Sequence, residues 1–214
     1  MAAKTTLNSH GQYDDLALDN ATPDRRGHPQ WDWEDMRIDV LDALERSDEA
    51  QMARWSCFER ALSVRHLRDY LKRLPDFDDV RTEEQALTYA ESHGSLLAAP
   101  SFLVAWPDLE RAARTVGRRA RELDGDHYEI LTPAANALAG KFPLAATLVL
   151  RSMIDFAVDR ARSGRYRHAA RHLLDCSGLA ASVEDWESFE THEAYIARLR
   201  NKHARKTSFW AEVE

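Results

Sequence analysis

Three stretches of the sequence decide its fold class: ALERSDEAQMARWSCFERAL (residues 43–62), AESHGSLLAAPSFLVAWPDL (residues 90–109) and ALAGKFPLAATLVLRSMIDF (residues 137–156). Their first residues are 47 positions apart in both steps, and they align without a gap. Each stretch has the pattern of a helix end, a tight turn and a second helix. A constant period of this length is typical of helical repeat arrays, in which each unit buries its apolar face against the next.

The same register continues on both sides of these stretches. Residues 31–42, 78–89 and 125–136 precede them, each with the pattern of a first helix. A third helix is indicated at residues 62–74 and 109–122 in the first two units. No segment alternates apolar and polar residues over the length of a strand. The sequence therefore predicts an all-α, right-handed α-solenoid of tetratricopeptide- or HEAT-like repeats, with a period of about 47 residues.

The beginning of the chain does not share this pattern. Residues 1–30 show no sustained helical period and include NATPDRRGHP (residues 20–29), which is rich in turn-forming residues. We interpret residues 1–30 as a mobile N-terminal arm or linker. Residues 31–210 are expected to form a single helical repeat domain that ends in a capping helix.

Composition limits the class of protein. Apolar residues make up 44% of the 214 residues and charged residues 30%, which is an ordinary balance for a folded soluble chain. The longest nearly apolar run, residues 142–150, stops at Arg151 and is far shorter than the roughly 20 residues of a membrane span. The first 30 residues lack the apolar segment of a signal peptide, so we expect a cytosolic protein with reduced Cys57 and Cys176.

Motifs that carry chemistry are missing from the sequence. None of the eight glycines belongs to a G-x-G-x-x-G or G-x-x-x-x-G-K pattern, and there is no C-x-x-C pair. This argues against nucleotide-dependent enzymes, and we expect no cofactor. We expect a non-enzymatic scaffold that presents a groove to a protein or peptide partner.

Charge is spread unevenly along the chain, from −8 in residues 1–107 to +1 in residues 108–214. The third helix of each unit is rich in arginine, whereas the first helices are acidic. In a solenoid equivalent helices line one wall, so these cations form either a solvated face or a basic face for an acidic protein segment or nucleic acid. Few aromatic residues are interleaved with them, which disfavours nucleic acid. The candidate partner-binding residues are Arg68, Arg114, Arg118, Arg165, Arg198 and Arg205.

A metal-dependent enzyme is the other alternative. His168, His172 and Cys176 are spaced four residues apart, so all three lie on one side of a helix. His192 or His203 from the last helix would supply a fourth ligand. The Glu of an H-E-x-x-H motif is absent, however, and single-helix spacing of this kind also arises in ordinary helix packing. We therefore expect no bound metal.

The C-terminal helix has a clear apolar face. On a helix over residues 192–206, Tyr195 and Leu199 share that face and are expected in the core. Phe209 and Trp210 follow the helix, and we expect them to fold back and cover the end of the array. The basic residues on the opposite flank are expected to face solvent, namely Arg198, Lys202 and Arg205.

At these residues the chain resembles a known family. HEAYIARLRNKHARKTSFW (residues 192–210), with HLRDYLKRLPDFDD and FPLAATLVLRSMIDFAV upstream, is similar to a bacterial, largely proteobacterial, domain-of-unknown-function family of helical proteins. A similar tail occurs in some SWIM zinc-finger proteins. The resemblance covers roughly residues 35–210 and implies a helical, tetratricopeptide-like module. It implies no activity and no catalytic residue, and the SWIM zinc ligands have no counterpart here.

Overall fold

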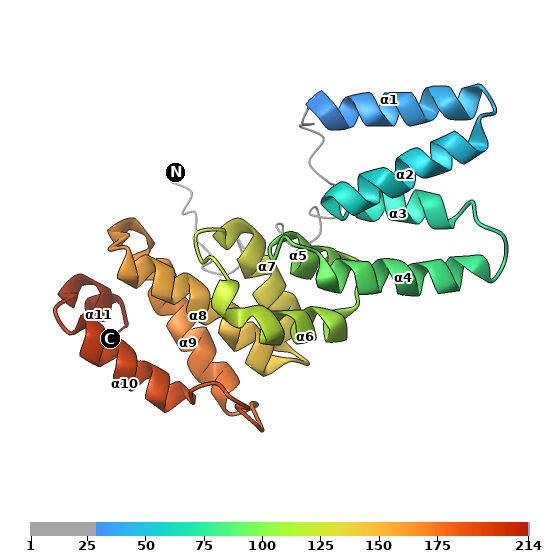
Figure 1. Ribbon diagram of the computed structural model, residues 1–214. Coiled ribbons are helices and arrows are strands. Elements are labelled where there is room, and N and C mark those ends of the chain that lie inside the picture. Colours follow the sequence, from blue (N-terminus) through green and yellow to red (C-terminus); the bar gives the residue numbers. More distant parts are fainter. Residues whose placement is uncertain (1–28, 214) are drawn as a thin grey trace, which may run out of the picture. The chain divides into compact units, whose positions relative to one another are not determined.

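The computed structural model describes residues 29–213. This part of the chain contains eleven α-helices and two short 3₁₀ helices, and it contains no β-strand, which confirms the all-α class (Figure 1). The helices are α1 (Pro29–Ala43), α2 (Ser47–Ala61), α3 (Val64–Leu71), α4 (Asp78–Ser92), α5 (Ala98–Ala105), α6 (Leu109–Arg119), η1 (Ala120–Glu122), α7 (Tyr128–Ala139), α8 (Pro143–Asp159), η2 (Ser163–Arg165), α9 (Tyr166–Ala180), α10 (His192–His203) and α11 (Thr207–Val213).

The predicted N-terminal arm, residues 1–30, falls almost wholly outside the described residues. Only Pro29 and Gln30 of that segment are described, and both already belong to α1. The chain divides into two compact units, Met1–Ala53 and Arg54–Glu214, with the boundary inside α2. We describe each unit separately.

The described part of the first unit consists of α1, a tight turn and the first half of α2. Glu45 adopts a left-handed conformation (φ 58°), and the Arg46 amide donates to the carbonyl of Leu41, which closes the end of α1. Ile38 and Leu41 are buried. Four large apolar side chains of α1 and the following turn remain exposed: Trp33, Met36, Val40 and Leu44.

The core of the second unit is built around α8. This helix packs against α7 and α9 along its length and also touches α6. Its sequence is apolar on most sides, as the nearly apolar run of residues 142–150 indicates, and its fully buried side chains include Val149, Ile154 and Val158. Burying such side chains on several sides contributes about 1.5–3 kcal/mol for each of them. The position of α8 therefore organises its neighbours.

The C-terminal helices close one end of this core. Tyr195 and Leu199 of α10 are fully buried, as their helical phase predicts. Phe209 of α11 is also fully buried and meets the ring of Tyr166 edge-on, with centroids 5.6 Å apart. Trp210 is half-buried, and its indole Nε1 donates to the carbonyl of His203 at 3.0 Å. The expectation that Phe209 and Trp210 fold back onto the core is confirmed.

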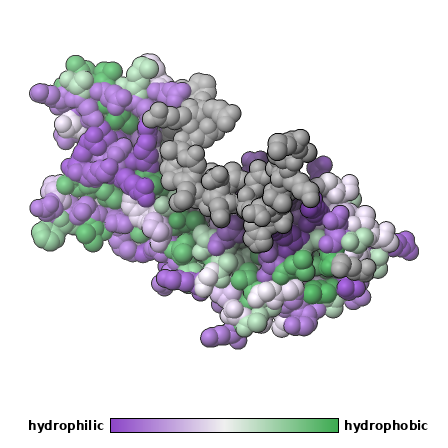
Figure 2. All heavy atoms as spheres, turned by 180° about the vertical axis from the view of Figure 1, so that it is seen from behind, coloured by the Kyte–Doolittle hydropathy of each residue, from purple (hydrophilic) through white to green (hydrophobic). Residues whose placement is uncertain are grey.

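The surface mixes polar and apolar side chains. Figure 2 shows hydrophobic patches interspersed with hydrophilic ones on the face that it presents. Among residues 29–213, none of the helices combines the length and the apolar character that a membrane span requires.

A close backbone approach fixes the segment before α7 against α8. Gly125 lies so near α8 that a Cβ atom built on it would be 2.1 Å from the carbonyl oxygen of Ser152. Only glycine fits this position, because the obstructing atoms belong to the backbone of a buried helix and cannot turn aside. Gly164, by contrast, has nothing within 4 Å of such a Cβ atom.

We predict that Gly125→Ala destabilises the protein strongly. The added methyl group forces the 124–127 segment away from α8, and we expect a loss at the upper end of the about 1–3 kcal/mol typical of overpacking. Urea denaturation followed by circular dichroism measures the change. Gly164→Ala is the matched control and should shift the free energy of unfolding by less than about 1 kcal/mol. Equal effects of the two substitutions would contradict the close approach.

Candidate functional site

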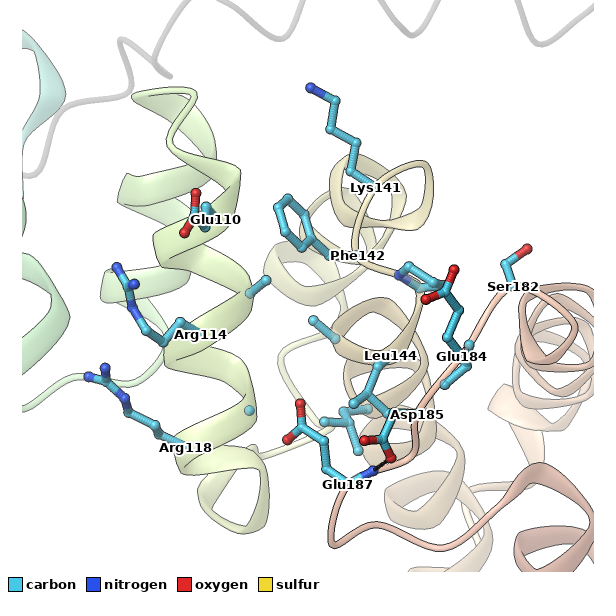
Figure 3. A pocket seen from close by; sticks show the side chains of 16 residues that line it. Glu110, Arg114, Arg118, Lys141, Phe142, Leu144, Ser182, Glu184, Asp185 and Glu187 are labelled. Carbon is cyan, nitrogen blue, oxygen red and sulfur yellow. Dashed lines mark hydrogen bonds between the residues drawn. The ribbon is translucent and has the colours of Figure 1, made fainter.

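A groove crosses the surface of the second unit between α6, the start of α8 and the segment that joins α9 to α10, residues 181–191 (Figure 3). Its volume is about 660 Å³. Its floor is apolar and is formed by Ala113 of α6, Val183 of the segment, and Phe142, Leu144, Ala145 and Leu148 at the start of α8. A cavity of this size and lining is of the kind that binds ligands or peptide side chains.

Local sequence explains how the three elements form the groove. Asp108 caps α6 by accepting from the amide of Arg111 at 3.0 Å. Ala113 and Gly117 are one turn apart on α6, and their small size leaves room on the face that lines the groove. Pro143 begins α8, where a missing amide hydrogen costs nothing. Thr191 ends the connecting segment by capping α10.

The charges around the groove are separated. Figure 3 shows Glu184, Asp185 and Glu187 on the side of the connecting segment. Asp185 accepts a hydrogen bond from the amide of Glu187 at 2.7 Å, which stabilises the turn in this segment. The guanidinium groups of Arg114 and Arg118 lie on the side of α6 away from Phe142. Glu110 and Lys141 also line the groove, so its charged lining has four carboxylates and three cations, a slight acidic excess.

Behind the same connecting segment lies a second group of polar residues, which we call the α8–α10 polar cluster. It consists of Arg151 and Asp155 of α8, Cys176 and Ser177 of α9, Glu190 of the segment, and His192, Tyr195 and Arg198 of α10. Hydrogen bonds and ion pairs join Arg151 to the backbone of Glu190, Ser177 to His192, and Asp155 to Tyr195 and Arg198, whereas Cys176 is buried beside them.

Arg198 holds two carboxylates of the cluster. Its guanidinium binds Glu190 at 2.8 Å and Asp155 at 3.3 Å, and it lies over the ring of Tyr195. The hydrogen bonds that Arg198 donates to Glu190 and the charge of Asp155 raise the pKa of Arg198. Burial raises the pKa of Asp155, although Arg198 and the hydroxyl of Tyr195, which donates to it at 3.1 Å, act in the opposite direction. Arg198 faces solvent only in part: 40% of its side chain is exposed, and its guanidinium is paired with the two carboxylates opposite its helical flank.

Two further members of the cluster are held in their neutral forms by burial. Burial lowers the pKa of His192, and the nearby positive charge of Arg151 lowers it further. The Nε2 atom of His192 is 2.9 Å from the hydroxyl of Ser177. Burial raises the pKa of the Cys176 thiol to about 12, so this group is protonated at neutral pH and is a poor nucleophile.

Most of the predicted partner-binding arginines contact other residues of the chain. Arg68 lies 5.4 Å from the Trp106 ring centroid, Arg114 pairs with Glu91 at 2.8 Å, and Arg165 pairs with Asp126 at 2.7 Å. Within the part of the chain that the structure describes, Arg118 and Arg205 have no such partner and are exposed. These two remain available cations, and their role in partner binding stays a prediction.

The alternative metal ligands, His168, His172 and Cys176, have different surroundings in the described structure. Among residues 29–213, no group of three or more His, Cys, Asp or Glu side chains is arranged to hold a metal ion. His168 is exposed, His172 lies 3.7 Å from Asp175, and Cys176 is buried next to the carbonyl of Thr147. The two histidines proposed as a fourth ligand are engaged elsewhere, His192 with Ser177 and His203 with Asp159 at 2.8 Å.

Sequence reasoning expected a groove but did not locate it, and it missed the buried Arg151. One signal for Arg151 was present, because it is the first charge after the apolar run of residues 142–150 and therefore falls in a helix that is buried on most sides. The groove had no sequence signal, since its walls come from three segments between residues 110 and 187.

One protein-family model matches almost the whole chain. The model of a family of unknown function, DUF6880, matches residues 2–212. The chain belongs to this family. The resemblance to a domain-of-unknown-function family that the sequence suggested is thereby confirmed. No curated protein and no solved structure matches the chain.

The Arg198 ion pairs generate a stability prediction. Arg198→Ala leaves Asp155 and Glu190 without their shared cation, and we expect it to cost about 1–2 kcal/mol because Arg198 is partly exposed and charged hydrogen bonds are lost. Arg205→Ala is the control and should stay within about 0.5 kcal/mol, as surface substitutions do. Urea unfolding of both variants decides the point, and equal stability of the two would refute the pairing.

Burial of His192 generates a pH prediction. Its pKa in the folded protein lies below the ordinary value of 6.5, so the unfolded chain takes up this proton first as the pH falls. The stabilisation is complete above pH 6.5 and decreases from there down to the folded-state pKa, by up to about 1.4 kcal/mol per pH unit. The ordinary histidine pKa of about 6.5 lies between pH 7.5 and pH 5.5. In urea titrations at these two pH values, His192→Gln should therefore lose less stability than the wild type as the pH falls. A variant that loses as much stability as the wild type would contradict the buried neutral histidine.

Proposed function

We propose that the chain is a non-enzymatic interaction scaffold that binds a short segment of a partner protein in the groove between α6, α8 and residues 181–191. The observation that supports this most directly is the 660 Å³ groove with an apolar floor and a charged rim. Grooves of this kind bind segments that place apolar side chains on the floor and polar ones along the rim.

The groove favours a particular kind of segment. Phe142, Leu144 and Leu148 form a floor for aliphatic or aromatic side chains of the partner. Glu184 and Glu187 are exposed carboxylates beside that floor, and Asp185 adds a third. A partner segment with apolar residues flanked by Lys or Arg complements both features, because opposite charges at an interface steer association and fix the register.

The helix order supports a repeat architecture for this scaffold. In the second unit α5 packs on α4 and α6, and α8 packs on α7 and α9, so the middle helix of each triplet contacts both of its neighbours. We infer that these triplets are successive turns of the tetratricopeptide-like right-handed solenoid with a period of about 47 residues. A bacterial, cytosolic scaffold is part of the same proposal, as is the likeness of its tail to those of SWIM proteins.

The alternative of nucleic-acid binding along a basic face receives less support. Arg114, Arg165 and Arg198 are each neutralised by a carboxylate of the same chain. Pairs of this kind reduce the charge that would attract phosphates. The carboxylates beside the groove would also repel a phosphate backbone.

The groove can be blocked without disturbing the core. A Cβ atom on Gly117 meets nothing within 4 Å, and Gly117 lines the groove from within α6. A larger residue there projects into open space, and replacing a helical glycine does not weaken the helix. Gly178, inside α9, is a matched control because its Cβ position is equally open and it does not line the groove.

We predict the outcome of a peptide-display selection on the wild-type protein. The selected peptides should carry apolar residues flanked by Lys or Arg. Gly117→Trp should reduce their affinity at least tenfold, which corresponds to about 1.4 kcal/mol, whereas Gly178→Trp should leave it unchanged. Glu187→Lys should weaken binding by a smaller factor that shrinks with added salt. Peptides that bind the Gly117→Trp variant as well as the wild type would place the binding surface elsewhere.

A further inference from the structure

Arg151 is a buried arginine whose hydrogen bonds are incomplete. It lies in the middle of α8, and only 5% of its surface is exposed. Its Nη1 atom donates to the backbone carbonyl of Glu190 at 2.8 Å. Its Nε and Nη2 atoms are buried and have no hydrogen-bond partner among the described residues. Buried polar groups are almost always paired, so these two donors require an explanation.

Among residues 29–213, no carboxylate forms an ion pair with this cation. The carboxylate of Glu190 is bound by Arg198, as is that of Asp155, which lies one turn after Arg151 on α8. The neighbouring Cys176 thiol is not an anion at neutral pH, because burial raises its pKa to about 12. The guanidinium carbon lies 4.5 Å from the ring centroid of Tyr195 and 4.8 Å from that of Trp186, and these rings offset part of the cost of burial. An unpaired buried charge still destabilises a protein.

The identity of the two unpaired atoms is informative. Nε and Nη2 lie on one edge of the guanidinium, and their N–H bonds are parallel, which is the arrangement that binds both oxygens of a carboxylate at once. Two other buried polar atoms without partners belong to the same neighbourhood, Nδ1 of His192 and Oγ1 of Thr147, which is one turn before Arg151 on α8. Buried polar atoms without partners therefore occur on neighbouring residues of α8 and α10 as well as on Arg151.

We propose that Arg151 anchors a carboxylate-binding site beneath residues 181–191, with Trp186 as its movable cover. Trp186 is half-buried, and its ring stacks on Arg151. It belongs to residues 181–191, which form neither a helix nor a strand. A single planar carboxylate matches one free guanidinium edge. A phosphate dianion fits less well, because the second arginine of the cluster, Arg198, is already neutralised.

The carboxylate has two possible sources, a small free acid or the C-terminus of a peptide. This site does not depend on the proposed function, because Arg151 and Trp186 do not line the groove. Failure of peptide binding at the groove would therefore leave the Arg151 site in place, and the reverse also holds.

The test follows the Nε–H signal of Arg151 by ¹H–¹⁵N correlation spectroscopy during titration with sodium acetate, at constant ionic strength set with sodium chloride. We expect a saturable shift of this signal. The Nε–H signal of Arg198 is the internal control and should not move, because that group already donates to Glu190. Trp186→Ala should lower the half-saturating acetate concentration several-fold, because it uncovers the guanidinium edge.

Further arms separate the sources and protect the test against misfolding. The first arm compares acetate with an N-terminally capped dipeptide that has a free C-terminus, and with the C-terminal amide of that dipeptide. If the dipeptide acid binds at least tenfold more tightly than both, the site binds peptide C-termini. If the dipeptide acid and acetate bind equally, the site binds small carboxylates. Acetate should raise the melting temperature of the wild type and leave that of Arg151→Met, which removes the buried charge, unchanged. The proposal is overturned if acetate gives no saturable shift in either the wild type or Trp186→Ala, or if phosphate and chloride give the same response as acetate.

Discussion

Burial of α8 is the constraint on which the second unit depends. The helix carries apolar side chains on most of its surface, so it is stable only when α6, α7 and α9 cover it. Its start forms the floor of the groove, its middle holds Arg151, and its last turns present Asp155 and Asp159 to α10. One buried helix therefore positions every feature to which we assign a function.

Attachment of the C-terminal helix follows from the polar side of α8. Asp159 accepts from Lys202 at 2.9 Å and lies 2.8 Å from Nε2 of His203, and these two partners lower the pKa of the Asp159 carboxyl against the effect of its burial. Together with the pairing of Asp155 and Arg198, this forms a charged seam between α8 and α10 beside the buried rings of Tyr195 and Phe209. Apolar burial holds the helix in place, and the ion pairs fix its register.

The segment of residues 181–191 connects the two candidate sites. Ser182, Glu184 and Glu187 form one wall of the groove, while Trp186 covers Arg151. A segment that lacks helical hydrogen bonds rearranges more readily than the helices at its ends. Movement of this segment would change the shape of the groove and the access to Arg151 together, so the two surfaces share one structural element.

The sequence by itself determined the local structure. Apolar spacing and turn residues predict the helices, the central place of α8 and the burial of Tyr195, Leu199 and Phe209, because side-chain phase on a helix depends only on position along the chain. Helical phase also places Arg198 on a polar flank. It does not reveal that Asp155 and Glu190 lie opposite that flank.

Only the tertiary structure decided where the groove lies and which polar side chains are paired. The groove exists because residues from 110 to 187 meet in space, and two donors of Arg151 have no partner among the described residues, whereas Arg198 binds both Asp155 and Glu190. Likewise, within residues 29–213 no second element brings enough further ligands to His168, His172 and Cys176 to form a group that could hold a metal ion. Such outcomes depend on which helices pack together, and this information is not contained in the period or phase of any one of them.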